Sequence, residues 1–306
     1  LLLEANENYW GGSPKIKKVI FRPIPEATTR VAGLQTQELD LIVNIPPHLS
    51  RLMDWKGRSH VGKVPSSRVI FMAFDTTRGG PVADKRVRQA IAQAIDLDTI
   101  IRKVLEGNAI KLGVPFTPYH FGYDPEIKPY AYNPEKAKNL LAEAGYSKGF
   151  DLLLHSPNGR YLNDKEVAET VVGDLRKIGI NATLKINEWG IHMTMLYAHN
   201  GSPSHILGWG GASFDADATL FPMLRTGQVL SHYSNPALDE LIEQARSIMD
   251  RKKRQQIYTE ASKLFHEEVP WAFCYEQIDI YGVSERVNWK PRADEKLIVW
   301  NMSFKK

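Results

Sequence analysis

Hydrophobic positions along the chain follow two alternating periods. Residues 17–22, 39–43 and 67–74 are short apolar runs rich in β-branched and aromatic side chains, the pattern typical of strands. Residues 26–35 lie between the first two runs and are consistent with a short helix. This alternation of strand and helix predicts an α/β protein.

The middle of the chain carries clear signals for helix starts. Asn133 precedes Pro134, and Asn235 precedes Pro236, so an amide side chain can cap each first turn while proline takes the first helical position. An apolar stripe at helical spacing follows each proline, and another follows Asp164. Further strands are expected at residues 182–186, 271–281 and 297–300.

Chain length and strand placement predict two lobes. A single hydrophobic core rarely serves more than about 250–300 residues, and this chain has 306. Residues 78–81 (RGGP) break the chain after an apolar strand, and a second strand returns near residue 275. We therefore expect a two-lobed clamp, with residues 1–73 and 279–306 in one lobe and residues 74–278 in the other.

Composition excludes two classes of protein. No run approaches the ~18 consecutive apolar residues of a membrane-spanning helix. The 39 basic residues are offset by 35 acidic ones, and the densest basic cluster, residues 251–254, falls at an expected helix start. We therefore predict neither a membrane span nor nucleic-acid binding.

Few residues are candidates for metal binding or redox chemistry. Cys274 is the single cysteine, so the chain can form no internal disulfide and no zinc site built from several cysteines. Its apolar surroundings predict a buried, inert thiol. Four histidines, at positions 192, 199, 205 and 232, show no metal-binding spacing. We expect no metal and no cofactor.

The stretch GWGGASFDAD, residues 208–217, is the most unusual in the chain. It places an indole and two carboxylates among glycines, which leave the backbone open to close approach. Such a stretch suits a structural turn, a catalytic or metal loop, or a surface that binds a ligand.

Several blocks resemble a known family, the extracytoplasmic solute-binding proteins of ABC importers for peptides, nickel chelates and related ligands. Residues 80–96 are similar to the family signature P-F-x-D-x-R-V-R-Q-A-[LI]-x-x-A-[IL]-[DN]. Residues 132–146 resemble its Y-[DN]-P-E-K-A-[KR]-x-L-L-x-E-A-G-[YF] block, and residues 5–14 its asparagine, tyrosine-tryptophan and glycine segment. The resemblance covers essentially the whole chain.

The resemblance implies a periplasmic-binding-protein-like α/β clamp with mixed sheets. It implies a non-enzymatic, extracytoplasmic protein, periplasmic or on the cell surface, that delivers a peptide or peptide-like ligand to ABC permease subunits. Full-length members carry a long region before the asparagine-tyrosine-tryptophan segment, so lobe I is expected to be incomplete here and the chain to be a C-terminal portion. The full-length protein is expected to be a monomer.

The resemblance also places the GWGGASFDAD stretch at the ligand cleft. In peptide-binding relatives an aspartate three residues after the tryptophan pairs with the ligand's amino group, and that position is Ala212 here. Ser213 or Asp215 could bind the amine instead, or the ligand could lack one, as a modified peptide, a glutathione-like compound, haem or a metal chelate would. The candidate ligand-binding residues are Trp209, Gly211, Ala212, Ser213, Asp215 and Tyr275.

Several of these residues could have purely structural roles instead of binding a ligand. Trp209 follows an apolar pair and could be core, while Asp215 and Asp217 could cap a helix. Tyr275 could line the cleft or pack between lobes. A remote alternative is a hydrolase using Ser213 or the aspartates 215 and 217, although the serine lacks the second glycine of a nucleophile elbow.

Position 212 yields a testable prediction for the complete protein. A short unmodified peptide should bind poorly, because the expected carboxylate is missing, and Ala212→Asp should improve its binding by about 1 kcal/mol or more. Titration calorimetry on the wild type and the variant measures this difference. Tight binding of plain dipeptides by the wild type would contradict the prediction.

Overall fold

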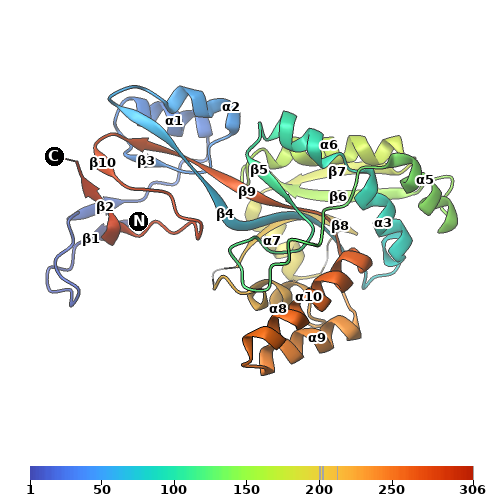
Figure 1. The fold of residues 1–306 in the computed structure, drawn as a ribbon. Coiled ribbons are helices and arrows are strands. Elements are labelled where there is room, and N and C mark those ends of the chain that lie inside the picture. The colour runs from blue at the N-terminus through green and yellow to red at the C-terminus, as the bar shows by residue number, and fades with distance from the viewer. Residues whose placement is uncertain (200, 202, 212, 306) are drawn as a thin grey trace. The chain divides into compact units, whose positions relative to one another are not determined.

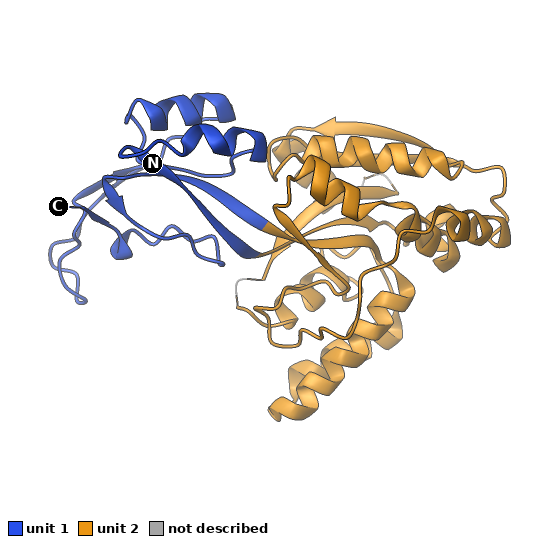
Figure 2. Cartoon of the chain, turned by 45° about the horizontal axis from the view of Figure 1, so that its top comes forward, with its two compact units in different colours: residues 1–66, 278–306 blue, residues 67–277 orange. Residues whose placement is uncertain are grey.

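The protein is described from a computed structural model, over residues 1–199, 201, 203–211 and 213–305. The chain forms two compact units, residues 1–66 with 278–306 and residues 67–277 (Figure 2). From the sequence, the lobe boundaries are predicted at 73/74 and 278/279. Two long strands, β4 (Ser59–Phe74) and β9 (Trp271–Ser284), carry the chain out of the first unit and back into it (Figure 1).

A mixed sheet is the centre of the fold. Among the described residues it has seven strands, in the order β3-β9-β4-β8-β6-β7, with β5 also paired to β9. Strand β4 pairs antiparallel with β8, whereas β6 pairs parallel with both β7 and β8. The bounds of the other strands are Leu41–Ile42 (β3), Ala109–Leu112 (β5), Asp151–Pro157 (β6), Asn181–Asn187 (β7) and Ser204–Gly210 (β8).

The predicted helix starts are confirmed. The Asn133 side chain accepts a hydrogen bond from Lys136 N (2.9 Å), and the Asn235 side chain accepts one from Ala237 N (3.0 Å). Asp84 likewise caps the helix of the family signature. The larger helices of the second unit are α3 (Lys85–Ala94), α5 (Pro134–Glu143), α6 (Asp164–Lys177), α7 (Trp189–Tyr197), α8 (Asp217–Leu224), α9 (Pro236–Ser247) and α10 (Arg251–Glu268).

One face of the sheet packs on a large apolar core beneath α8, α9 and α10 (Figure 1). We call it the helical core. Val69 and Phe71 contribute from β4 and Leu207 from β8, and the Phe71 and Trp271 rings stack at 3.5 Å. None of the helices in the described ranges is long and apolar enough to cross a membrane.

The first unit is smaller and differs from the prediction at its C-terminal end. Its remaining elements are β1 (Leu2–Glu4), β2 (Lys18–Ile20), α1 (Ala27–Gln35), α2 (Pro47–Ser50), β10 (Val287–Asn288) and β11 (Ser303–Phe304). Residues 297–300 do not form the predicted strand, since a 3-10 turn spans Val299–Asn301. Leu297 and Val299 instead pack directly on the core around Tyr281 and Met302, so this apolar run is covered without a strand partner.

Three buried histidines of the second unit lie on β6 (His155), α7 (His192) and β8 (His205). The Asn187 side-chain amide lies 2.8 Å from His155 Nδ1 and 3.3 Å from His192 Nδ1, and His192 Nε2 lies 3.0 Å from the Ile206 oxygen. Burial lowers the pKa of His192 to about 4, and burial lowers that of His205 well below its usual value. Both imidazoles are therefore neutral in the folded protein at pH 7.

These histidines predict acid sensitivity. Below pH 6.5 the unfolded chain binds protons at His192, while the folded protein does so only near pH 4, so stability falls as the pH falls through this window. The fall in pKa from 6.5 to about 4 corresponds to about 3 kcal/mol for His192 alone, lost in full only below pH 4 and in part by pH 5. Urea unfolding at pH 7, 6 and 5 should show this loss, and a smaller loss in His192→Gln. Parallel pH profiles for the two proteins would contradict it.

Candidate functional site

The end of β8 brings the GWGGASFDAD stretch against β4. In this antiparallel register Trp209 lies opposite Val69, and Gly210 lies opposite Arg68. Because side chains alternate along a strand, Trp209 and Val69 face the helical core, whereas Arg68 faces the other side of the sheet. The two faces therefore present different chemistry near the same strand end.

A loop after β6 is held in place by one carboxylate. Asp164, the first residue of α6, accepts hydrogen bonds from the backbone N–H groups of Gly159 (2.8 Å), Arg160 (2.9 Å) and Tyr161 (3.0 Å). The Tyr161 hydroxyl in turn accepts a hydrogen bond from Gly208 N (2.8 Å). This places Arg160 and Tyr161 beside β8, where the carboxyl ends of parallel strands commonly carry binding sites in α/β sheets.

Two guanidinium groups share the Tyr161 ring. The Cζ atom of Arg68 lies 5.8 Å from the ring centroid and that of Arg160 lies 5.3 Å from it. Arg160 Cζ is also 5.0 Å from the Trp189 ring, which meets the Tyr161 ring edge-on at 6.1 Å. We call Arg68, Arg160, Tyr161 and Trp189 the arginine–aromatic cluster. Such paired cations and flat rings suit a ligand that carries a carboxylate and an apolar body.

Trp209 is half-buried. Its indole Nε1 donates a hydrogen bond to the Ala218 oxygen (2.7 Å), and its ring packs against the helical core. The structure thus gives the ring a structural role and leaves part of its surface exposed. Its predicted contact with ligand stays a prediction.

Gly211 meets a protein side chain on the side where a Cβ would point. A Cβ built there would lie 2.3 Å from His120 Nε2, so the absence of a side chain accommodates His120. Gly208 is similar, since a Cβ there would lie 2.6 Å from the Tyr161 ring. Ser213 is exposed, and Ala212 lies outside the described residues.

The aspartates of the stretch are engaged by other protein groups. Asp215 forms an ion pair with Arg254 (2.7 Å) and accepts a hydrogen bond from the Tyr258 hydroxyl (2.9 Å). It also accepts one from Asp217 N (3.0 Å) at the start of α8, which agrees with the capping alternative. Asp217 lies 3.5 Å from Arg246 Nε. An aspartate so engaged is a poor candidate for a general base.

Tyr275 is buried in the second unit, with 1% of its surface exposed. Its ring is nearly parallel to that of Phe273, at 5.9 Å, and its hydroxyl has no hydrogen-bond partner among the described residues. Burial raises the pKa of this phenol well above its usual value. As for metals, nowhere in the described ranges do three or more His, Cys, Asp or Glu side chains form a group that could hold an ion.

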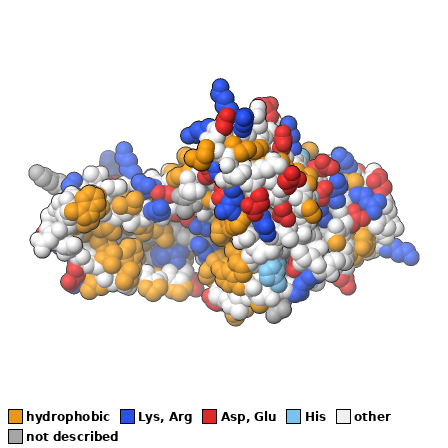
Figure 3. All heavy atoms as spheres, turned by 90° about the horizontal axis from the view of Figure 1, so that it is seen from below, with side chains coloured by type: hydrophobic (Ala, Val, Ile, Leu, Met, Phe, Trp, Pro, Cys, Tyr) orange, Lys and Arg blue, Asp and Glu red, His pale blue; other side chains and the backbone are white. Residues whose placement is uncertain are grey.

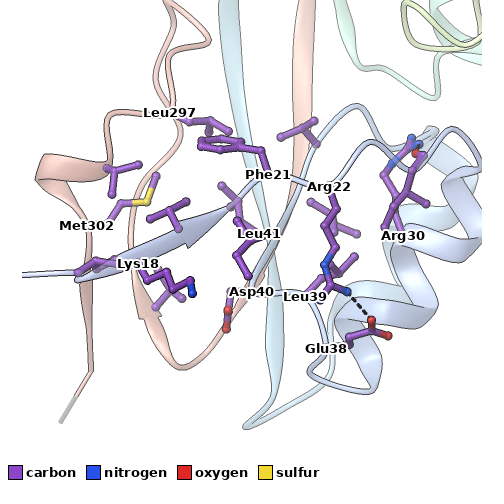
Figure 4. A pocket seen from close by; sticks show the side chains of 18 of the residues that line it. Lys18, Phe21, Arg22, Arg30, Glu38, Leu39, Asp40, Leu41, Leu297 and Met302 are labelled. Carbon is purple, nitrogen blue, oxygen red and sulfur yellow. Dashed lines mark hydrogen bonds and ion pairs between the residues drawn. The ribbon is translucent and has the colours of Figure 1, made fainter. Parts of the chain in front are cut away.

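The first unit contains a separate pocket of about 440 Å³. Figure 4 shows Phe21, Leu41, Leu297 and Met302 lining it, and Figure 3 shows apolar side chains gathered over this unit at the left of the view. Among the charged groups that line it, Arg22 forms an ion pair with Glu38 at 2.5 Å. The labelled apolar side chains make much of this pocket's surface hydrophobic.

The arginine–aromatic cluster is absent from the residues singled out in the sequence. A signal for it exists: Arg160 and Tyr161 follow an apolar strand and precede a helix, at the kind of strand end where ligands bind. Arg68 and Trp189 carry no comparable local signal. They join the cluster only through β4–β8 pairing and the packing of α7.

Comparisons with known proteins agree with the fold. Residues 1–231 match the model of bacterial extracellular solute-binding proteins, family 5 Middle. The chain is 31% identical to "Heme-binding protein A" of Haemophilus influenzae over 296 residues, covering 92% of the chain and 53% of that relative. It is 30% identical to "Dipeptide-binding protein" of Escherichia coli over 282 residues, covering 87% and 51%. The chain thus spans about half the length of these relatives.

Solved structures show the same architecture. The periplasmic binding protein DppA from Helicobacter pylori, in complex with the peptide STSA, matches with a TM-score of 0.90 and 26% identity, covering 100% of this chain and 60% of that one. NikA from Staphylococcus aureus, in complex with Ni(L-His)2, matches with a TM-score of 0.87 and 24% identity, covering 99% and 66%. The predicted fold class, an α/β periplasmic-binding-protein fold with mixed sheets, is confirmed.

The contact between Gly211 and His120 predicts a stability effect. Gly211→Ala should lower the free energy of unfolding by ~1–3 kcal/mol, because the new methyl group overlaps the buried imidazole. The matched control is Gly210→Ala, where the nearest atom would be 3.7 Å from the Cβ and stability should be unchanged or slightly higher. Urea unfolding compares them, and equal stability of the two variants would refute the packing argument.

Proposed function

The chain belongs to the bacterial extracellular solute-binding proteins of family 5, and from this premise we propose that the complete protein is the substrate-binding component of an ABC importer. This is a family of binding proteins rather than of enzymes. In the proposed function the protein captures a peptide or peptide-like ligand between two lobes and delivers it to permease subunits in the membrane. It acts outside the cytoplasm, in the periplasm or on the cell surface, as a monomer.

The observation that carries the ligand class is the arginine–aromatic cluster. Arg68 and Arg160 place two positive charges within 6 Å of one ring centroid, and a guanidinium binds a carboxylate through two parallel hydrogen bonds. The Tyr161 and Trp189 rings give apolar contact area beside these charges. Relatives named for dipeptides, and the similar structure holding the peptide STSA, support a ligand with a free carboxylate.

A second candidate is a non-peptide acid such as haem, a glutathione-like compound or a metal chelate. It is favoured by the similarity to a relative named for haem and to one named for glutathione. Haem propionates are carboxylates that suit the same two arginines, with the macrocycle against the aromatic rings.

The proposed lobes are residues 1–73 with 279–306, and residues 74–278.

The ligand is identified most directly from the complete protein purified without denaturation. Native mass spectrometry should show a co-purifying small molecule, and adding that compound should raise the melting temperature. Recovery of the compound unchanged supports a binding protein. Recovery of cleaved products would instead favour the hydrolase alternative.

Arg160 provides a sharper test of the ligand's carboxylate. Arg160→Gln should weaken binding of the tripeptide Ala-Ala-Lys by roughly 10- to 100-fold, the effect of one charge-assisted contact of about 1.5–3 kcal/mol. The same peptide with an amidated C-terminus should bind wild type and variant alike. Lys165→Gln is the control, because it removes one exposed positive charge nearby, at the start of α6. Equal losses for both peptides would rule out a carboxylate contact.

A further inference from the structure

Glu276 is a buried carboxyl group without a partner in the part of the chain that the structure describes. Only 2% of its surface is exposed, and within the described ranges no hydrogen bond or ion pair reaches its carboxylate. Other buried acids are satisfied: Asp164 accepts backbone N–H groups, Asp174 pairs with Lys177 (2.7 Å), and Asp75 accepts the Thr77 hydroxyl (2.6 Å). Burial raises the pKa of Glu276 to about 7.

The register of β9 places Glu276 on the same face of the sheet as Trp209. Cys274 lies opposite Leu112 and both belong to the helical core, so Glu276, two residues along, faces that side as well. Trp209 packs against the same core from β8. Strands β9 and β8 flank β4, which separates these residues by two strand spacings, or about 10 Å if they are level.

The two residues are close to level along the strands. Strand β4 leaves the first unit and β9 returns to it, so these neighbouring strands run in opposite directions. The backbone N–H of Phe74 donates to the Pro270 oxygen (3.1 Å), which brings residue 276 to within about one residue of position 68 on β4. Position 68 lies opposite Gly210, where β8 ends. Glu276 is thus near the strand end that carries the arginine–aromatic cluster, although it points to the other face of the sheet.

Glu276 is buried but lies next to an exposed residue. Its cross-strand neighbour on the same face, Ile110, is 43% exposed. Burial, Glu276 and Asp124 together raise the pKa of Tyr123, which places this phenol near Glu276, and a phenol is not a cation. Lys111, on the neighbouring strand, pairs with Asp98 (2.7 Å). No described side chain supplies the positive charge that would stabilise the Glu276 carboxylate.

We propose that Glu276 binds a cationic group of the ligand, an ammonium, at the edge of the helical core. An unpaired carboxylate in this position is unfavourable, and an ammonium entering beside it removes that penalty by direct charge pairing. This inference rests on the proposed function and adds an ammonium group to the features expected of its ligand.

The test uses the complete protein and the tripeptide Ala-Ala-Lys, with two derivatives in which either the α-amine or the side-chain amine is acetylated. In the wild type, one of the two acetylations should weaken binding at least tenfold. In Glu276→Gln that acetylation should cost nothing. Glu126→Gln is the matched control, because it removes an exposed carboxylate from the segment that carries Tyr123. An equal loss in wild type and Glu276→Gln overturns the inference.

A second measurement needs no variant. Binding of an ammonium should shift Glu276 to its charged form and release about half a proton per ligand at pH 7, given a pKa near 7. Calorimetry in buffers of different ionisation enthalpy measures this number. The peptide whose critical amine is acetylated should release none. Identical proton release by all three peptides contradicts the proposal even if the glutamine variant fails to fold.

Failure of the proposed function has a different signature. If the wild type binds none of the three peptides even weakly, the peptide-binding function is wrong. Putrescine, a diamine without a carboxylate, then decides the role of Glu276 alone. Binding of putrescine by the wild type but not by Glu276→Gln supports the cation site, and no binding by the wild type overturns it.

Discussion

The antiparallel pairing of β4 with β8 is the interaction on which the candidate site depends. Residue pairs from Arg68–Gly210 to Phe74–Ser204 lock the two strands in one register. Since side chains alternate along a strand, this single register sends Trp209 to the helical core and Arg68 to the opposite face. A slip of one residue would exchange the two faces and separate Arg68 from Tyr161.

Polar groups near this strand end fall into two classes. Asp164 and Asp215 are satisfied within the protein, where they hold a loop and a helix start in place. Arg68 and Arg160, which lie by the Tyr161 ring, and Glu276, by the helical core, are the groups that we propose contact the ligand. Because Asp164 and Asp215 fix a loop and a helix start, less conformational entropy is lost when the neighbouring charged side chains bind a ligand.

The helix starts and most strands could be predicted from local sequence because their causes are local. An asparagine before a proline satisfies the first turn of a helix within four residues of chain, as at Asn133 and Asn235. The predicted strand at residues 297–300 was wrong because an apolar run indicates burial but not the partner. That segment packs on side chains rather than beside another strand.

The sequence by itself determined the α/β class, the family and the capped helices, since these rest on periodicity and on motifs contiguous in the chain. Only the tertiary structure decided which side chains of the site meet. Arg68 joins Arg160, 92 positions away, through strand pairing and a loop held by Asp164. It also showed that Asp215 forms an ion pair with Arg254 and that Glu276 has no partner among the described residues. Pairing, burial and charge compensation depend on residues distant in sequence, so no local pattern encodes them.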